Sequence, residues 1–328
     1  MHGEVIHRRK PVSKFNEQRY ILFLHYRPIM GIYVEIAIQS SMDELWEKTQ
    51  NPELHQRWDL RFTQIEYLRP QAGEPQKFLY RTRIGFGLKI DGNGESSGTR
   101  EGDDGTRTSS LQFWSADPKS LIKVGSGYWK YIHDGDRISF LTWYDYEIRF
   151  GLLGKAIDLC LFRRLLGWAT AWSFDRLRLW IECGIPPESS RDRMLVYSIA
   201  RGTLALTWLY HGLVPKLLHH DAIELDLLSR IRTPRSQLTM AVTSVGLTEV
   251  FFGLLLIVLW RHRWPLWLTA LFMLVSTPVV AISAPAYLEA AFNPLTFNLA
   301  LAALAGIALI AGDHLPSATR CRRKPAQE

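Results

Sequence analysis

The sequence predicts an α+β domain, in which an antiparallel sheet surrounds a long C-terminal helix, followed by an all-α membrane four-helix bundle. Two observations predict this fold class. Residues 30–184 contain several stretches in which apolar and polar side chains alternate, the pattern of half-buried strands. Four apolar stretches then follow one another, and each is close to the roughly 20 residues that an α-helix needs to cross a bilayer.

Residues 1–29 are rich in Arg, Lys and His and show no periodicity, so we expect a disordered basic extension. Met30 is followed at once by a strand pattern, and two interpretations stay open. Either Met30 is the true start and the preceding segment is an upstream extension, or that segment is a basic arm of the protein. Neither interpretation gives it a catalytic role.

The first domain begins with a strand at Ile32 and two short helices. Ser41 can cap the first helix with Glu44 as the acid of a capping box, and Asn51-Pro52 separates the two helices. Alternation then predicts strands at 62–68, 77–90, 106–115, 121–131 and 137–150. Hairpin turns are predicted at 91–94 and 103–105, where Asp, Asn and Gly gather.

A long apolar helix closes the domain over about 153–182, and Gly184 with two prolines stops it. Its three- and four-residue spacing predicts a face against the sheet, formed by Ile157, Leu161, Leu165, Trp168 and Trp172. Arginines at positions 163, 164, 176 and 178 occupy the remaining surface. Two interpretations stay open: a core helix with a solvated basic face, or a lid near the bilayer whose arginines contact lipid phosphates.

This element order, together with Arg57-Trp58-Asp59 after the short helices, resembles the START-like or SRPBCC superfamily, the helix-grip fold of polyketide cyclases and lipid-transfer domains. The resemblance covers about residues 32–182. It implies a cavity for a hydrophobic small molecule or lipid, and it does not imply catalysis. For Trp58, packing at a helix end is the alternative to a place in the site. The candidate cavity residues are Trp58, Leu161, Leu165, Trp168 and Trp172.

The predicted domain boundaries place the ligand-binding domain at 30–184, a linker at 185–193, the membrane domain at 194–314 and a basic tail at 315–328. The membrane spans are expected at about 194–214, 239–260, 265–283 and 294–312. Cations gather in the loop 261–263 and in the tail, whereas the loop 287–292 has none. We expect an integral protein of the bacterial inner membrane, and the positive-inside rule predicts that both termini lie in the cytoplasm.

Ionisable residues inside a bilayer are costly, so each one indicates a function or a paired structural role. Arg201, His211-Gly212, Pro215-Lys216 and Gly246-Leu-Thr-Glu249, with the four-helix layout, resemble the DoxX-like membrane family over about residues 196–313. We expect Glu249 to be protonated or paired with His211 or Arg201. It would bind a quinone carbonyl, pass a proton, or only fix helix packing. The resemblance gives five polar-site positions: Arg201, His211, Lys216, Glu224 and Glu249.

The predicted function is binding of a hydrophobic ligand, such as a lipid, quinone or polyketide-like molecule, by a membrane-anchored protein. The alternative is a non-catalytic or quinone-linked subunit of a membrane redox or thiol-stress complex, because some DoxX-like relatives accompany such systems. We do not expect an enzyme on its own. The three cysteines lie far apart and His220 with Glu224 is a weak pair, so no metal site and no built-in cofactor are predicted.

The expected partners are the phospholipid membrane, a hydrophobic small molecule such as a bound quinone or lipid, and either a membrane redox partner or further copies of the chain. The net charge of +7 is modest, and the arginines lie mainly beside apolar segments. This pattern favours anionic phospholipid over nucleic acid.

Overall fold

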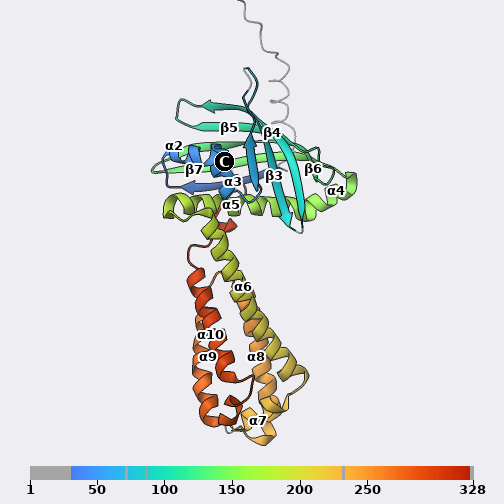
Figure 1. Cartoon of the computed structure of the whole chain (residues 1–328), viewed down its shortest axis with the longest axis vertical. Coiled ribbons are helices and arrows are strands. Elements are labelled where there is room, and N and C mark those ends of the chain that lie inside the picture. The colour runs from blue at the N-terminus through green and yellow to red at the C-terminus, as the bar shows by residue number, and fades with distance from the viewer. Residues whose placement is uncertain (1–30, 71–72, 86, 231–232, 326–328) are drawn as a thin grey trace, which may run out of the picture. The chain divides into compact units, whose positions relative to one another are not determined.

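The computed structural model describes residues 31–325, apart from 71–72, 86 and 231–232. The extension predicted over residues 1–29, and the question of Met30 with it, lies outside the described residues. The chain forms two compact units (Figure 1). The first, the helix-grip domain, ends at Phe174 and takes in the segment from Thr319 onward; the second, the membrane domain, comprises Asp175–Ala318. The division therefore falls inside the closing helix, earlier than the predicted boundary at 184.

A seven-stranded antiparallel sheet forms the helix-grip domain, in the order β1-β7-β6-β5-β4-β3-β2. Along β1 every second residue is buried, as the alternation of apolar and polar side chains predicts. The strands are β1 (Ile32–Ile38), β2 (Gln64–Tyr67), β3 (Lys77–Gly85), β4 (Leu88–Glu101), β5 (Arg107–Trp114), β6 (Ile122–Asp134) and β7 (Arg137–Ile148).

The hairpin turn predicted at 91–94 is wrong, because these residues lie inside β4. Gly92 and Gly94 are opposite Tyr80 and Phe78 of β3, and the two aromatic rings lie over them. A Cβ atom on Gly92 would come within 2.2 Å of the Tyr80 ring, so these glycines make room for aromatic side chains rather than for a turn. The predicted turn at 103–105 is confirmed by the positive φ of 74° at Gly105.

The short helices are α2 (Met42–Gln50) and α3 (Pro52–Trp58). The side chains of Ser41 and Asn51 cap them by accepting hydrogen bonds from the backbone N–H groups of Glu44 and Glu53. The predicted closing helix consists of three consecutive segments: α4 (Gly151–Ile157), the π-helix η1 (Asp158–Phe162) and α5 (Arg163–Cys183). The π-helix changes the number of residues per turn and so shifts which side chains share a face.

Aromatic side chains fill the space between the sheet and α5 where α3 lies. Phe174 of α5 stacks on Phe140 of β7 with ring centroids 4.5 Å apart, and Trp58 contacts Phe174 at 6.0 Å. All three side chains are fully buried. Farther along α5, the hydroxyls of Tyr144 and Thr170 are 2.8 Å apart. The core of the domain is therefore a closely packed aromatic layer.

The segment after residue 318 returns to the helix-grip domain. Arg322 and Glu35 of the edge strand β1 exchange two backbone hydrogen bonds of 2.9 Å. The thiol of the buried Cys321 donates to the carbonyl of Ala171 at 3.2 Å. The tail predicted over 315–328 as a region of its own is thus, from Thr319, part of this domain.

The membrane domain is helical. The linker predicted over 185–193 is mostly helix, because Pro187 occupies the first turn of α6, where a proline is favoured. The elements are α6 (Pro187–His211), the π-helix η2 (Gly212–Leu218), α7 (Ala222–Arg230), η3 (Arg235–Gln237), α8 (Leu238–Val258), α9 (Trp264–Ser283), η4 (Pro285–Leu288), α10 (Pro294–Ala311) and η5 (Ala318–Arg320), whose last two residues belong to the helix-grip domain.

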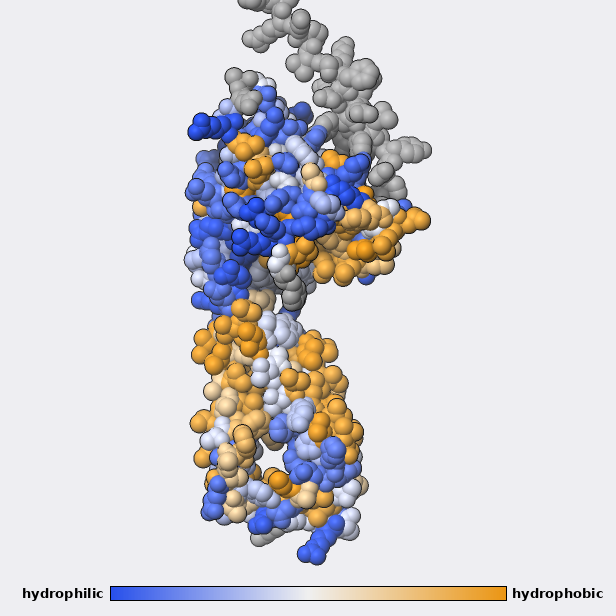
Figure 2. Space-filling model, turned by 45° about the vertical axis from the view of Figure 1, so that its right-hand side comes forward, coloured by the Kyte–Doolittle hydropathy of each residue, from blue (hydrophilic) through white to orange (hydrophobic). Residues whose placement is uncertain are grey.

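Three helices in the described part of the chain are long and apolar enough to cross a membrane: Arg235–Val258, Trp264–Ser283 and Pro294–Ala311. They match three of the four expected spans. The fourth, 194–214, lies in α6 and η2, which carry Arg201 and His211 and do not reach the same apolar composition. Leu204 of α6 packs with Leu256, Leu266 and Ala305 in the core that joins it to α8, α9 and α10. Figure 2 shows extensive apolar surface on this domain.

Candidate functional site

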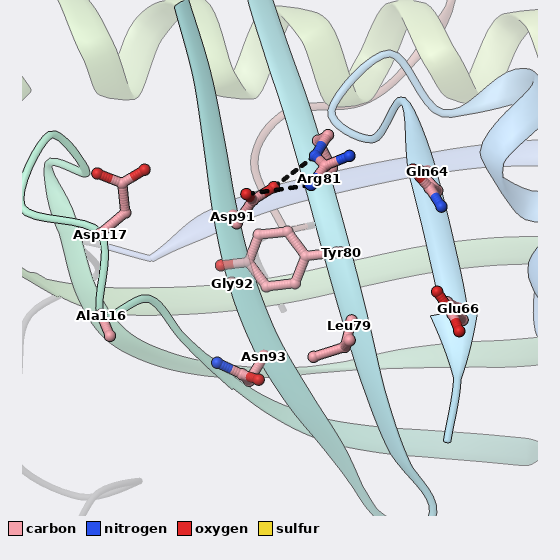
Figure 3. A pocket seen from close by; sticks show the side chains of 10 residues that line it. All are labelled: Gln64, Glu66, Leu79, Tyr80, Arg81, Asp91, Gly92, Asn93, Ala116 and Asp117. Atoms are coloured by element: carbon pink, nitrogen blue, oxygen red, sulfur yellow. Dashed lines mark hydrogen bonds and ion pairs between the residues drawn. The ribbon is translucent and has the colours of Figure 1, made fainter. Parts of the chain in front are cut away.

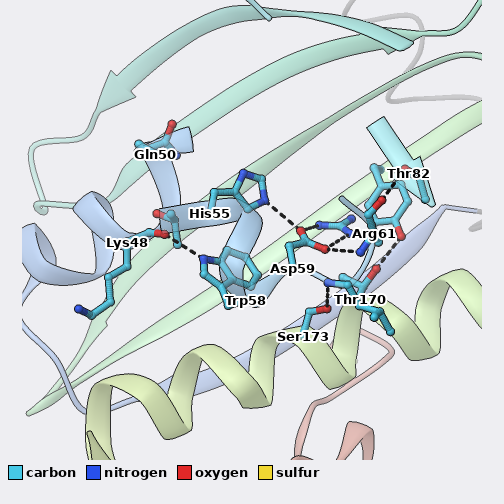
Figure 4. Close-up of polar contacts among 12 residues, drawn as sticks. Lys48, Gln50, His55, Trp58, Asp59, Arg61, Thr82, Thr170 and Ser173 are labelled. Atoms are coloured by element: carbon cyan, nitrogen blue, oxygen red, sulfur yellow. Dashed lines mark hydrogen bonds and ion pairs between the residues drawn. The ribbon is translucent and has the colours of Figure 1, made fainter. Parts of the chain in front are cut away.

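Trp58, the first predicted cavity residue, is a packing residue. Its indole N–H donates to the carbonyl of Lys48 at 2.9 Å (Figure 4). Its ring contacts those of His55, Trp129 and Phe174. The side chain is fully buried. These neighbours occupy the space in which a ligand was expected to lie beside Trp58.

Leu161, Leu165 and Trp168 do not face the sheet, and that expectation is wrong. They are 57%, 52% and 44% exposed, because Asp158 in the π-helix and Thr170 in α5 take the inward positions. Trp172, the fifth predicted residue, is buried and stacks on Trp168. The exposed side chains form one surface, which we call the apolar strip: Phe150, Leu152, Leu153, Ile157, Leu159, Leu161, Leu165 and Trp168.

A buried ionic group lies in the helix-grip domain beside α3 (Figure 4). Asp59 accepts hydrogen bonds of 2.9 and 2.6 Å from Arg61, and His55 Nε2 lies 3.0 Å from the same carboxylate. Burial opposes the charge on Asp59, but Arg61 and His55 outweigh it and hold the pKa of that carboxyl well below its usual range. Burial lowers the pKa of His55, and the nearby Asp59 offsets only part of this. No spacing in the sequence indicates that Arg61 joins the group.

A pocket of about 490 Å³ opens on the sheet at β2, β3 and β4 (Figure 3). Tyr80 points toward the core, where its ring meets Phe62 at 5.5 Å, and burial raises the pKa of Tyr80 to about 12. Neighbouring strand residues point to opposite faces, so Leu79 and Arg81 lie on the face away from the core. The pocket is therefore distinct from the expected cavity between sheet and helix. It is lined by Gln64, Glu66, Leu79, Tyr80, Arg81, Asp91, Gly92, Asn93, Ala116 and Asp117.

In the membrane domain, two glycines bring η2 and α8 into backbone contact. A Cβ atom on Gly212 would lie 2.5 Å from the carbonyl oxygen of Gly246, and one on Gly246 would lie 2.9 Å from the Cβ of Lys216. Small residues allow membrane helices to approach this closely. The contact places Lys216 next to Glu249, one turn along α8. The glycines were part of the motif that carried the family resemblance, but their mutual contact follows only from the fold.

Lys216 is the centre of a charged group built from η2, α7 and α8. Its Nζ donates to Glu224 Oε1 at 2.9 Å and to the backbone carbonyl of His211 at 3.5 Å, and it lies 3.1 Å from Glu249 Oε2. The side chains of Lys216, Glu249 and Glu224 are 8%, 13% and 23% exposed. Glu249 is therefore paired, and its partner is Lys216 rather than the expected His211 or Arg201. We call these three side chains the lysine–carboxylate site.

The other two predicted polar residues have different surroundings. The ring of His211 packs against Phe297 of α10, with centroids 5.1 Å apart. Arg201 is fully buried and donates to the carbonyls of Leu256, Leu259 and His262, at the C-terminal end of α8, and to the hydroxyl of Tyr197. Arg201 thus satisfies carbonyls that a helix end leaves free. None of these Arg201 contacts involves the lysine–carboxylate site.

The lysine–carboxylate site has more hydrogen-bond acceptors than donors. The ammonium of Lys216 has three N–H groups and three neighbours, whereas each carboxylate has about four acceptor positions. Glu249 Oε2 is buried and accepts no hydrogen bond of good geometry from the described residues. The site can therefore accept further hydrogen bonds from a polar group that enters it. Within the described residues, no three or more His, Cys, Asp or Glu side chains come together as metal ligands.

Comparison with known proteins identifies the family to which the membrane domain is similar. Residues 205–306 match the model of the DoxX-like family. The chain is 53% identical over 182 residues to the uncharacterized membrane protein YndG of Bacillus subtilis, a match that covers 55% of this chain and 68% of YndG.

Two solved structures resemble the first domain. A STAR-related lipid transfer protein fragment from Xanthomonas axonopodis is 14% identical, with a TM-score of 0.34, over 48% of this chain and 97% of its own. Human StAR-related lipid transfer protein 5 is 12% identical, with a TM-score of 0.37, over 52% and 94%. At these identities no side-chain role carries over from them. The chain belongs to the same family as the Bacillus subtilis membrane protein YndG, and its membrane half is a DoxX-like domain.

Proposed function

We propose that this protein binds a hydrophobic small molecule in its membrane domain, with the polar head of the ligand at the lysine–carboxylate site. The observation that carries the proposal is the buried Glu249 Oε2, which lies 3.1 Å from Lys216 Nζ and has capacity to accept another hydrogen bond. A buried polar group that keeps an unused acceptor position costs free energy. A ligand that donates a hydrogen bond removes that cost.

The chemistry of the site selects among the predicted ligand classes. A quinone carbonyl only accepts hydrogen bonds, whereas the site holds more acceptors than donors: Lys216 already donates to Glu224 and to the His211 carbonyl, and both carboxylates keep acceptor positions. A quinol, or a lipid with a hydroxyl or ammonium head, donates hydrogen bonds to Glu224 and Glu249. The proposed ligand is therefore a hydroxyl- or ammonium-bearing amphipathic molecule, and its apolar body lies among the membrane helices.

The proposed location is a bacterial inner membrane, with the helix-grip domain and the tail in the cytoplasm. The cations of the loop 261–263 and of the tail support this orientation. A membrane redox partner and an assembly of several copies stay predictions.

The test is native mass spectrometry of the full-length protein from mild detergent, followed by organic extraction of the molecules that copurify. We expect a stoichiometric quinol or lipid in the wild-type protein. Glu249→Gln replaces an ionised acceptor by a neutral amide, and occupancy should fall at least about tenfold, because a hydrogen bond to a charged group contributes about 1.5–3 kcal/mol.

Glu289→Gln is the matched control, since Glu289 is an exposed carboxylate in the loop between α9 and α10. It should retain the ligand fully. If Glu249→Gln keeps the ligand at wild-type occupancy while the protein stays folded, the ligand lies elsewhere and the proposed site is wrong. A wild-type protein that carries no small molecule, even after incubation with quinols and lipids, would refute the proposed function.

A further inference from the structure

The apolar strip lies where a water-soluble domain is not expected to expose large side chains. Its eight residues are between 43% and 88% exposed, with Leu152 and Leu153 the most exposed at 88% and 69%. They lie within a single stretch of 19 residues, 150–168, at the start of the closing helix. Contiguous apolar surface of this kind marks a surface that contacts a partner or a membrane. Figure 2 shows apolar surface on the helix-grip domain as well as on the membrane domain.

Buried polar contacts hold the strip outward. Asp158 of η1 is 3% exposed, and it accepts hydrogen bonds from the Tyr146 hydroxyl at 2.7 Å and from Arg163 Nε at 2.9 Å. These bonds fix the polar side of the π-helix to the sheet, so that Leu159 and Leu161 point away from it. At the start of the strip, Phe150 adopts a left-handed φ of 67° and is 54% exposed. A bulky residue in this conformation is strained, and the fold maintains it.

The charges around the strip fit lipid phosphates. Asp158 is the one acidic residue in 150–168, and it is buried. Lys155 and Arg164, in the same stretch, are exposed. The tail adds an exposed cation here: the guanidinium of Arg323 lies beside Gly167 of α5, 4.0 Å from where a Cβ would be. An apolar face bordered by Lys and Arg is the pattern of helices that lie in a membrane interface.

The strip is also tethered to a bilayer by the chain. The helix that carries it ends at Cys183, and α6 of the membrane domain begins at Pro187. A phospholipid surface is therefore present wherever this domain is, whereas any other partner has to be recruited. We propose that the apolar strip inserts into the interface of the phospholipid bilayer in which the protein is anchored, with Lys155, Arg164 and Arg323 on headgroup phosphates.

Cys160 provides a direct test, because it is exposed within the strip. A nitroxide is attached to Cys160 of the full-length Cys183→Ser protein, reconstituted in nanodiscs of phosphatidylcholine and phosphatidylglycerol in a two-to-one ratio. Electron paramagnetic resonance compares the collision of the label with oxygen, which concentrates in the acyl region, and with a water-soluble nickel chelate. We expect oxygen to dominate at Cys160. A label at Asp136→Cys in a Cys160→Ser background, in the exposed β6–β7 turn, should be dominated by nickel.

Two variants test whether the environment of the Cys160 label depends on insertion of the apolar strip. Leu153→Glu combined with Leu161→Glu should move the Cys160 label into nickel-accessible water, because carboxylates are costly in the interface. Ile84→Glu is the matched control: Ile84 is 59% exposed on β3, outside the strip, and its change should leave the label dry.

Two results would overturn the proposal. One is a Cys160 label that is as accessible to nickel as the label at position 136. The other is dipolar broadening at Cys160 that disappears on dilution with unlabelled protein, since that would show a second copy of the chain on the strip instead of lipid.

Discussion

Asp59 keeps its charge inside the helix-grip domain because Arg61 and His55 surround it. The two hydrogen bonds from Arg61, 2.9 and 2.6 Å long, replace the water that a carboxylate loses on burial. The ring of His55 lies between this group and the aromatic core, 4.9 Å from Trp129 and 5.0 Å from Trp58. The residues around Trp58 therefore stabilise the domain and leave little room for a ligand.

His55 makes the stability of the domain dependent on pH. Burial lowers its pKa below the ordinary value of 6.5, so below that pH the unfolded chain binds a proton that the folded chain does not. The free energy of unfolding therefore falls as the pH falls below 6.5, by up to about 1.4 kcal/mol per pH unit. Asp59 acts in the same direction, but only below its own ordinary pKa of 3.8. Urea unfolding of the full-length protein in detergent, followed by tryptophan fluorescence at about pH 7 and about pH 5, measures the difference.

His55→Gln is the comparison for this prediction. The variant should be less stable at neutral pH, because it loses the contact with Asp59, but its stability should change less between the two pH values. If the free energy of unfolding depends on pH equally in the wild type and the variant, a group other than His55 is responsible for the dependence.

Among the secondary-structure elements, the contact between η2 and α8 creates the lysine–carboxylate site. Gly212 and Gly246 let the two backbones touch, and the π-helix with Pro215 inside it turns Lys216 toward Glu249. Neither helix could come this close with side chains at these two positions. The charged group therefore depends on backbone packing as much as on the three charged residues.

Gly246→Ala should disturb this packing. The added methyl would lie 2.9 Å from both the Gly212 carbonyl and Lys216 Cβ, so η2 and α8 must separate. We expect a lower melting temperature of the membrane domain in detergent and a loss of ligand comparable to that of Glu249→Gln. Gly306→Ala in α10 is the control, because no atom outside the local backbone of its own helix lies within 4 Å of the added methyl, and alanine favours helix over glycine by about 0.8–1.0 kcal/mol. Equal stability of the two variants would show that the glycine contact is unimportant.

Element identity could be predicted from the sequence more reliably than the direction of side chains. The capped helices after Ser41 and Asn51 follow from local hydrogen bonding, and they are confirmed. The face predicted for the closing helix is wrong because the π-helix η1 interrupts the 3.6-residue period. No spacing in the sequence reveals that Asp158 is buried and fixes η1 to the sheet. Gly92 and Gly94 resemble a turn, but their cross-strand partners are aromatic, and cross-strand partners depend on register.

The candidate site shows the same division. Lys216, Glu224 and Glu249 were predicted as polar positions, and the fold brings them together around Lys216. Arg201 was predicted with them from the DoxX-like resemblance, and a charged residue in a membrane segment can have a functional or a structural role. Its guanidinium instead binds three carbonyls near the end of α8, an arrangement set by where two helices cross.

Contacts within the membrane domain show which loops and helix ends lie together at each of its two ends. Arg263, before α9, pairs with Asp313, after α10, at 2.5 Å. The Tyr287 hydroxyl, in the loop between α9 and α10, donates to Asp226 of α7 at 2.7 Å. Arg201 bonds to His262 at the first end, and Lys216 bonds to Glu224 of α7 at the second. The segment from Arg201 to Lys216 therefore runs from one end of the domain to the other, as α8, α9 and α10 do.

The number of membrane crossings follows from this path and from the tail. Arg322 pairs with Glu35 in the helix-grip domain, so we expect the residues before α6 and after α10 to be on the same side of the membrane. An even number of crossings is then required. The three apolar helices supply three, and we expect α6 with η2 to supply the fourth although its composition is less apolar. Its charges are tolerated because Arg201 donates to backbone carbonyls and Lys216 pairs with Glu224 inside the bundle.

Thiol labelling of intact cells with a membrane-impermeant reagent tests this topology. Single cysteines at Asp136, Arg261 and Lys324, introduced into a Cys160→Ser and Cys183→Ser background, should react only after permeabilisation, because four crossings place all three on one side and the proposed orientation makes that side the cytoplasm. A cysteine at Glu289, between α9 and α10, should react at once. If α6 does not cross, the chain has three crossings, and Arg261 and Lys324 change sides relative to Asp136. Labelling of Lys324 in intact cells with protection of Asp136 would thus refute the fourth crossing and, with it, the pairing of Arg322 with β1.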